Sequence, residues 1–231
     1  MENLESWKFK VGSILSGNIA RADCAGIFHA VCDELGDYYR EKGFKYARSG
    51  PHLTIKSGDI KLKIAFWSSR SNISGEFVNL EIVPSFESVS LAKNLSKKKK
   101  ENGFLFGHNV VFQKYEYCED ECDVIVRYPF KAELKRSDPN YRNLVKYNHN
   151  INVYGLTEEN FVRIVNYIND LVVSLIDVLQ DEAQLDNYLK SLPEFLVRYI
   201  FIEKRSNSKM PEYLQFKFPE LCNQFLSEIC E

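Results

Sequence analysis

The stretch that decides the fold reads IKLKIAFW and occupies residues 60–67. Apolar side chains stand at every second position, and lysines stand at two of the positions between them. Because successive side chains of a β-strand point to opposite faces, this period of two predicts a strand with one buried face and one wet face. The preceding residues, Ser57-Gly58-Asp59, are typical of a tight turn. A sheet with one solvated face is therefore expected to include this segment.

The segments around this strand predict an antiparallel meander that ends near Pro84. Residues 78–83 alternate in the same way, with apolar side chains at positions 78, 80 and 82. Residues 44–49 and 52–56 are further strand candidates.

A helix is predicted ahead of the meander, over residues 21–42. Its apolar side chains recur at helical spacing; they are Ala25, Phe28, Val31 or Cys32, Leu35 and Tyr38. Gly43 follows as a stop, because glycine takes positive φ without strain.

The middle of the chain predicts a mixture of short elements. A helix is expected over residues 88–101, where it runs into the lysines at 97–100. Gly103 and Gly107 then bracket a predicted loop. Two strands are expected over residues 110–117 and 124–128, joined by an acidic turn that Glu119, Asp120 and Glu121 form.

The last third of the chain predicts helices. Thr157 is a natural N-cap, and the apolar series after it follows helical spacing without a miss; it comprises Phe161, Ile164, Val165, Ile168, Leu171, Val172, Leu175, Ile176 and Leu179. A second helical stretch over 184–204 is predicted to split at Pro193, with Ser191 and Glu194 forming a capping box. Residues 205–210 are expected to form a polar loop, and Pro219 is expected to open the last helix.

These elements predict an α+β fold. We expect one continuous domain over 1–231, in which a helix and an antiparallel sheet fill 1–155. The helical region over 156–231 is expected to pack on that sheet.

Composition places the chain among globular proteins. It has 231 residues, a formal net charge of −2, 45% apolar residues and 13% aromatic residues. No apolar run approaches the roughly 20 residues of a membrane-spanning helix, and the first residues are too polar for a secretory signal. The six cysteines are too sparse for a disulfide scaffold. We therefore expect a cytoplasmic protein with reduced thiols and no membrane partner.

The familiar catalytic signatures are absent from the sequence. It has no G-x-G-x-x-G, P-loop, G-x-S-x-G, H-E-x-x-H or C-x-x-C motif. This absence argues against nucleotide-dependent enzymes and common hydrolases, and no cofactor is expected.

One enzymatic alternative rests on Asp123, Glu133 and Lys135. The spacing D-x₉-E-x-K resembles the divalent-metal site of the restriction-nuclease superfamily. The resemblance implies that the two carboxylates hold Mg²⁺ near a phosphodiester while the lysine positions the attacking water. Pro129 interrupts the strand that such a site needs, and an ordinary charged surface is the favoured interpretation of the triplet.

A zinc site is a second candidate. Cys118 and Cys122 lie four residues apart, and His108 or His149 could complete a tetrahedral site. The histidines are not at a standard spacing from the cysteines, so free thiols around a turn are the favoured interpretation and no metal is expected.

Residues 127–148 combine basic and aromatic side chains, a mixture that can pair with phosphates and stack on bases. The basic residues assigned to this candidate nucleic-acid surface are Arg127, Lys131, Arg136, Arg142 and Lys146. A solvated face with anchoring aromatics is the favoured alternative.

Charge is distributed unevenly along the chain. Residues 1–110 hold 16 basic and 12 acidic side chains, which gives +4, and the remainder holds 14 and 20, which gives −6. Acidic side chains on the predicted helices could dock a basic partner; they are Asp170, Asp177, Asp181, Glu182 and Asp186.

The leading hypothesis is a non-enzymatic cytosolic protein that binds a macromolecule, most simply another protein. An accessory or immunity-type role in a bacterial defence or conflict system is the associated expectation. The alternative is a Mg²⁺-dependent nuclease built on Asp123, Glu133 and Lys135. Oligomeric state is not encoded in any feature of the sequence.

These two hypotheses predict different outcomes in a nuclease assay. The binding hypothesis predicts that the purified chain leaves plasmid and oligonucleotide substrates intact with Mg²⁺ or Mn²⁺, as it does with chelator. Metal-dependent cleavage that disappears in Asp123→Ala and in Glu133→Ala would contradict it and support the nuclease.

Overall fold

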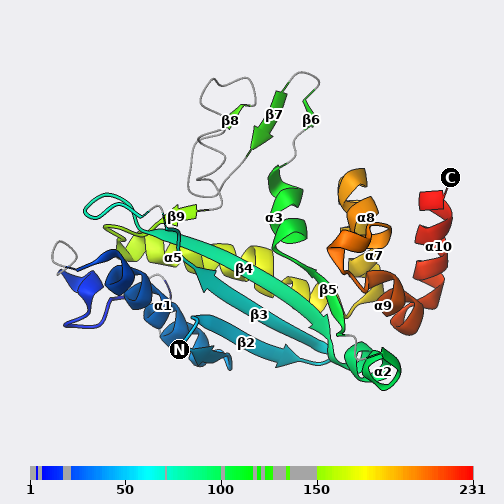
Figure 1. Cartoon of the computed structure of the whole chain (residues 1–231), viewed down its shortest axis with the longest axis horizontal. Coiled ribbons are helices and arrows are strands. Elements are labelled where there is room, and N and C mark those ends of the chain that lie inside the picture. Colours follow the sequence, from blue (N-terminus) through cyan, green and yellow to red (C-terminus); the bar gives the residue numbers. More distant parts are fainter. Residues whose placement is uncertain are drawn as a thin grey trace. The chain divides into compact units, whose positions relative to one another are not determined.

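A computed structural model describes residues 4, 7–17, 22–70, 72–99, 102–116, 119–120, 123–126, 134–135 and 150–230. It has an N-terminal helix, a six-stranded antiparallel sheet and a C-terminal helical region (Figure 1). The α+β fold class predicted from the sequence is therefore confirmed.

The chain divides into two compact units that interleave along the sequence. Unit 1 comprises Met1–Ile55, Lys63–Val83 and Cys118–Asp170. Unit 2 comprises Lys56–Leu62, Pro84–Tyr117 and Leu171–Glu231.

The main sheet has the strand order β1-β2-β3-β4-β5, and β9 also pairs with β4. Its strands are β1 (Lys45–Ala47), β2 (His52–Ser57), β3 (Ile60–Trp67), β4 (Asn79–Ser88), β5 (Phe104–Gly107) and β9 (Asn150–Asn152). A second, three-stranded sheet pairs β6 (Glu119–Asp120), β7 (Asp123–Val126) and β8 (Leu134–Lys135).

Strand β3 shows the predicted alternation. Its four apolar positions, from Ile60 to Phe66, are at most 2% exposed. Lys61, Lys63 and Trp67, which point the other way, are exposed. Burying each large apolar side chain contributes about 1.5–3 kcal/mol, so the register of this strand is fixed by which face it buries.

Helix α1 (Cys24–Arg40) closes one side of unit 1. The Asp23 carboxylate accepts a hydrogen bond from Gly26 N at 2.7 Å and caps the helix. A Cβ on Gly36 would lie 2.4 Å from Tyr46 Cδ1, so glycine is needed for α1 to approach β1 this closely. The predicted inward face holds from Phe28 onward, whereas Ala25 in the first turn is exposed.

The segment before α1, which contains the short helix η2 (Ile14–Ser16), is held by aromatic stacking and by acidic side chains. Trp7 stacks on Phe161 of α5 (Glu158–Ile168), with ring centroids 5.4 Å apart. The backbone N–H of Phe9 donates to Glu158 Oε1 at 3.1 Å. The backbone N–H of the next residue, Lys10, donates to Glu34 Oε1 at 3.4 Å.

The long helical series begins at Thr157, as predicted, because Thr157 Oγ1 accepts a hydrogen bond from Asn160 N at 3.2 Å. It is not one continuous α-helix: a π-helical turn, η4 (Asn169–Val173), separates α5 from α6 (Leu175–Val178). At this turn the Tyr39 hydroxyl donates to Asn169 Oδ1 at 2.9 Å and also approaches the Val165 carbonyl. An inserted side chain of this kind accompanies a local change in helical hydrogen bonding.

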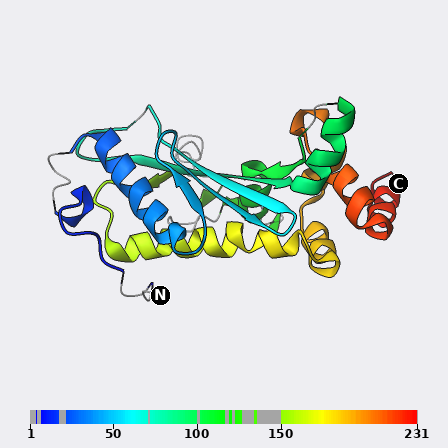
Figure 2. The same ribbon diagram turned by 90° about the horizontal axis from the view of Figure 1, so that it is seen from below.

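The remaining helices belong to unit 2. They are α2 (Val89–Lys99), α3 (His108–Glu116), α7 (Glu182–Lys190), α8 (Glu194–Phe201), η5 (Lys204–Ser206), α9 (Met210–Lys217) and α10 (Pro219–Cys230). The helix predicted to open at Pro219 is confirmed. Helices α9 and α10 lie side by side in both ribbon views (Figures 1 and 2).

The predicted loop between Gly103 and Gly107 is wrong, because these residues form β5. A Cβ on Gly103 would lie 2.2 Å from the Ser88 carbonyl oxygen, and one on Gly107 would lie 2.9 Å from the Pro84 carbonyl oxygen. Both glycines therefore mark a close approach of two backbones, not a loop.

The strand predicted over residues 110–117 is also wrong, because residues 108–116 form α3. Val110, Val111 and Phe112 are buried in succession, and a short apolar run of this kind fits a strand or a helix equally well. The predicted acidic turn is wrong at Glu119–Asp120, which pairs with β7 as strand β6.

The predicted capping box at Ser191 is wrong. Ser191 ends α7, and its hydroxyl donates to the Tyr188 carbonyl at 2.6 Å, while Pro193 occupies the N-cap position of α8. The predicted polar loop contains the short helix η5, and α9 after it was not predicted.

Within the described part of the chain, no helix combines the length and the apolarity that crossing a membrane requires.

Glu34 supplies a test of the packing in unit 1. Burial raises the pKa of this carboxyl, and the hydrogen bond from Lys10 N and the Lys10 charge only partly oppose the rise. A raised folded-state pKa means that stability is fully present below the ordinary glutamate pKa and is lost as the pH rises through the raised value. We expect Glu34→Gln to be more stable than the natural chain at pH 7 and equally stable in acid, as measured by urea unfolding.

The matched control is Glu159→Gln, at an exposed position of α5 in the same unit. A Glu34→Gln variant less stable than the natural chain at pH 7 would show that the carboxylate stabilises unit 1.

Candidate functional site

An apolar groove of about 510 Å³ lies in unit 2 between α2, α9 and α10. Its apolar lining residues are Leu91, Leu95, Pro211, Phe216, Cys222 and Leu226. Asn94, Glu212 and Gln215 add polar groups. Each of the three helices therefore contributes apolar side chains to one depression.

The side chains at the floor of the groove are buried, whereas those at its edges are exposed to solvent. Leu91 and Cys222 are buried, whereas Phe216 is 48% exposed and Leu226 is 39% exposed. Large apolar side chains exposed on neighbouring helices are typical of protein-binding surfaces.

The first turn of α2 is fixed by a residue distant in sequence. Asp59, in the turn between β2 and β3, accepts a hydrogen bond from Ser90 N at 2.8 Å through Oδ1. Its Oδ2 accepts from Ser88 Oγ at 2.6 Å, and its carbonyl oxygen accepts from Val89 N at 2.9 Å. Ser88 Oγ in turn accepts from Leu91 N at 3.1 Å. Asp59 and Ser88 thus satisfy the N-terminal amides that a helix cannot satisfy itself.

The charge of Asp59 is stabilised by the same contacts. Burial by itself would raise the pKa of this carboxyl, but the hydrogen bonds from Ser88 and Ser90 outweigh it, and the pKa is lowered. The Lys217 charge acts in the same direction. The stabilisation that Asp59 provides is therefore present at neutral pH and is lost as the pH falls.

The turn that carries Asp59 is held on its other side by Gln180. Gln180 Oε1 accepts a hydrogen bond from Asp59 N at 2.9 Å, and Gln180 Nε2 donates to the Ile176 carbonyl at 3.1 Å. Gly58 has φ +56°, and a Cβ there would lie 2.0 Å from Gln180 Oε1. Only glycine at position 58 leaves room for Gln180, and the Gln180 contact fixes where the turn lies within unit 2.

Helix α9 is tied to β5 and to the end of α6. Lys209 N donates to the Phe104 carbonyl at 2.7 Å, and the Ser208 hydroxyl donates to the Leu105 carbonyl. Further along, the Tyr213 hydroxyl donates to the Leu179 carbonyl at 2.6 Å. These bonds fix the wall from which Phe216 projects.

Helix α10 is positioned by apolar contacts. Phe225 stacks on Phe201 of α8 with ring centroids 5.9 Å apart. Cys222 Sγ lies 3.7 Å from the Pro211 carbonyl oxygen, toward which it donates. Burial raises the pKa of the Cys222 thiol, which favours an inert floor residue over a reactive nucleophile.

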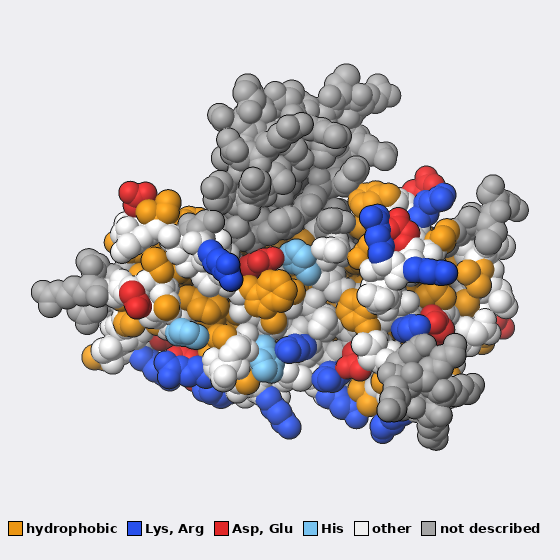
Figure 3. Space-filling view, in the orientation of Figure 1, with side chains coloured by type: hydrophobic (Ala, Val, Ile, Leu, Met, Phe, Trp, Pro, Cys, Tyr) orange, Lys and Arg blue, Asp and Glu red, His pale blue; other side chains and the backbone are white. Residues whose placement is uncertain are grey.

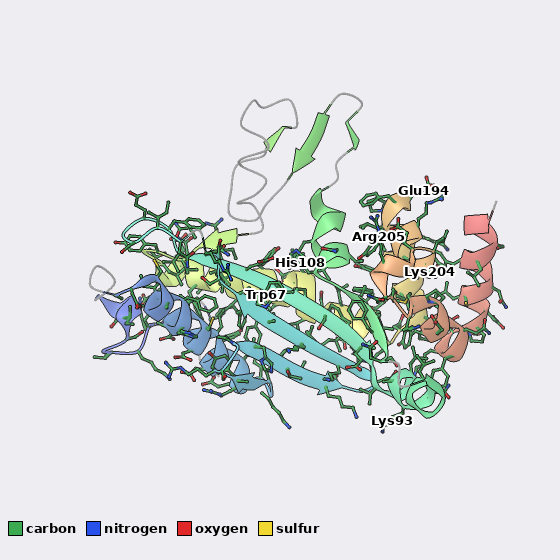
Figure 4. The ribbon with its side chains drawn as sticks, in the orientation of Figure 1. Trp67, Lys93, His108, Glu194, Lys204 and Arg205 are labelled. Carbon is green, nitrogen blue, oxygen red and sulfur yellow. The ribbon has the colours of Figure 1, made fainter. Side chains whose placement is uncertain are left out.

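The charges around the groove differ from wall to wall. Helix α2 carries Lys93 and then Lys97, Lys98 and Lys99, with no acidic residue between Val89 and Lys99. Figure 4 shows Lys93 extending outward from α2. The acidic Glu212 at the groove forms an ion pair with Lys209 at 3.3 Å. The sequence of α2 is therefore basic, whereas the α2 residues that line the groove are Leu91, Asn94 and Leu95.

A second, more polar pocket of about 750 Å³ lies beside η5, where Figure 4 labels Lys204. Three charged residues of its lining have internal partners, since Glu203 pairs with Arg205 and Glu212 pairs with Lys209. The hydroxyls of Ser206 and Ser208 bond within the loop or to β5. These bonds explain the local loop structure.

The structure describes only part of the predicted nuclease site. Asp123 lies in β7 and Lys135 in β8, and the two strands pair with Lys135 opposite Ile125. Glu133 lies outside the described residues, so the assembly of the triplet stays a prediction.

The other predicted sites lie largely outside the described part of the chain. This applies to the basic residues Arg127, Lys131, Arg136, Arg142 and Lys146. It also applies to Cys118, Cys122 and His149, whereas His108 begins α3. Among the described residues, no group of three His, Cys, Asp or Glu side chains is placed to hold a metal ion.

Two members of the predicted acidic surface have structural roles. Asp181 caps α7 by accepting from Gln184 N at 2.9 Å, and Asp186 pairs with Lys190 at 2.8 Å. The groove itself was missed because α9 was missed. Pro211 carried a usable signal, because proline is favoured in the first turn of a helix.

No protein-family model, curated protein or solved structure matches this chain.

Proposed function

We propose that the chain is a non-enzymatic binding protein that docks a helix of another protein in the groove of unit 2. The observation that carries this proposal is the exposure of Phe216 and Leu226 on either side of a buried apolar floor. A groove between helices accepts an amphipathic helix through apolar side chains spaced at i, i+3 or i+4, and i+7.

The charge of α2 specifies the partner further. Four lysines on the helix that forms one wall favour a docked helix whose flank is acidic. The floor contacts supply affinity by burying apolar surface, and the lysines supply orientation and a faster association rate. The partner is therefore an amphipathic helix with one acidic edge.

The biological setting of this binding protein stays a prediction from the sequence. An accessory or immunity-type role in a bacterial defence system is compatible with a protein partner of the stated chemistry. The nuclease alternative is likewise a prediction, and the cleavage assay tests it separately.

A helical peptide library provides the test. Peptides of about 18 residues, or five helical turns, are displayed on phage and selected against the natural chain. The enriched peptides are then titrated against a Phe216→Ser/Leu226→Ser double variant, which takes no part in the selection. We expect the enriched peptides to share an apolar stripe and an Asp/Glu flank, and to lose at least tenfold in affinity toward the double variant.

The matched control is Phe195→Ser, because Phe195 is an exposed aromatic residue of α8 in the same unit. Circular dichroism and the Tm of each variant establish that it is folded. Enriched peptides that carry a basic flank, or that bind the double variant as tightly as the natural chain, would overturn the proposed function.

A further inference from the structure

Unit 1 carries a second candidate binding surface, on the main sheet. In unit 1, strands β1, β2 and β3 turn one face toward the core and the other toward solvent. We call the second of these the outer sheet face of unit 1, and define it by Lys45, Ala47, His52, Lys63, Ala65 and Trp67. Each of these side chains is exposed or half-buried.

Trp67 is the most unusual residue of this face. Its side chain is 56% exposed, whereas Trp7 is buried. Figure 4 labels Trp67 on the sheet, and the space-filling view in the same orientation shows hydrophobic side chains among Lys, Arg and His side chains over the sheet (Figures 3 and 4). A large aromatic ring open to water on a flat strand provides a stacking surface.

The strand register places two lysines on the same face as this ring. Lys45 lies opposite Thr54 on β2. The hydrogen bond from Phe66 N to the Pro51 carbonyl, at 2.9 Å, aligns β2 with β3 so that Thr54 also lies beside Lys63. Lys45 and Lys63 therefore flank one residue, and neighbouring strands are about 4.8 Å apart.

The same alignment keeps the surface flat between the lysines and the tryptophan. His52 lies opposite Ala47 on β1 and beside Ala65 on β3. Along β3, Lys63 and Trp67 are four residues apart on the same face, which is about 13 Å. The acidic outward residue contributed by β4 in unit 1 is Glu81, which is half-buried.

We infer that the outer sheet face of unit 1 binds single-stranded nucleic acid, with a base stacked on Trp67 and phosphates near Lys45 and Lys63. Lysine is depleted from the centres of protein–protein interfaces, whereas lysines on the same face as an exposed aromatic ring are typical of single-strand platforms. Unpaired bases present the flat faces that such a ring accepts, and a duplex hides them. This surface is independent of the groove in unit 2.

Fluorescence anisotropy with labelled oligo(dT) and oligo(U) probes tests the inference. We expect salt-dependent binding, weaker binding of a duplex of matched length, and quenching of tryptophan emission on titration. Trp67→Ala is expected to weaken single-strand binding at least tenfold, and Trp67→Phe to retain most of the affinity because it keeps a stacking ring. Lys45→Gln and Lys63→Gln should each reduce the salt slope by about one.

Lys42→Gln is the matched control, because Lys42 lies over the Tyr38 ring beyond the end of α1 and not on the outer sheet face. Binding that does not change with salt, or that Trp67→Ala leaves intact, would overturn the inference. So would equal competition by polyglutamate, which would show that an acidic polypeptide is recognised and that base stacking has no part.

Discussion

The carboxylate of Asp59 is the interaction on which the architecture of unit 2 depends. It lies in a two-residue turn between β2 and β3, yet it satisfies the first amides of α2. Gln180 holds the same turn from the other side, and Gly58 leaves room for it. The first amides of the helix donate to a residue that is distant in sequence. Because these hydrogen bonds are short and stabilise the carboxylate charge, they fix the position of the helix N-terminus. The α2 wall of the groove is set by this contact.

The two units present different kinds of surface to solvent. In unit 1 the sheet buries one face and leaves an aromatic and basic surface on the other. In unit 2 three helices surround a buried apolar floor, and Phe216 and Leu226 are exposed to solvent. Among the described residues, no group of three His, Cys, Asp or Glu side chains is placed to hold a metal ion. The binding roles proposed for both surfaces rest on apolar and aromatic contacts, with charge selecting the partner.

The sequence predicted those elements whose pattern is local. The period of two in residues 60–67 and the cap at Thr157 both determine their structure through neighbouring residues. Gly103, Ser191 and residues 110–112 were misread because their roles depend on contacts with other segments: a close backbone approach, the end of a preceding helix, and burial on all sides. The groove could not be predicted for the same reason, since Asp59 and Ser90 are 31 positions apart and Phe216 lies on a helix whose apolar periodicity is weak.

The most direct test of the central claim is hydrogen exchange of α2 in Asp59→Ala, measured together with the affinity for a peptide selected against the groove. Removing a helix cap costs about 1–2 kcal/mol, so the amides at the start of α2 should exchange about 5- to 30-fold faster and the peptide should bind more weakly. Asp181→Ala removes the cap of α7 in the same unit and should leave both quantities unchanged. Unchanged exchange in α2 and unchanged peptide affinity in Asp59→Ala would contradict the claim that Asp59 positions this wall.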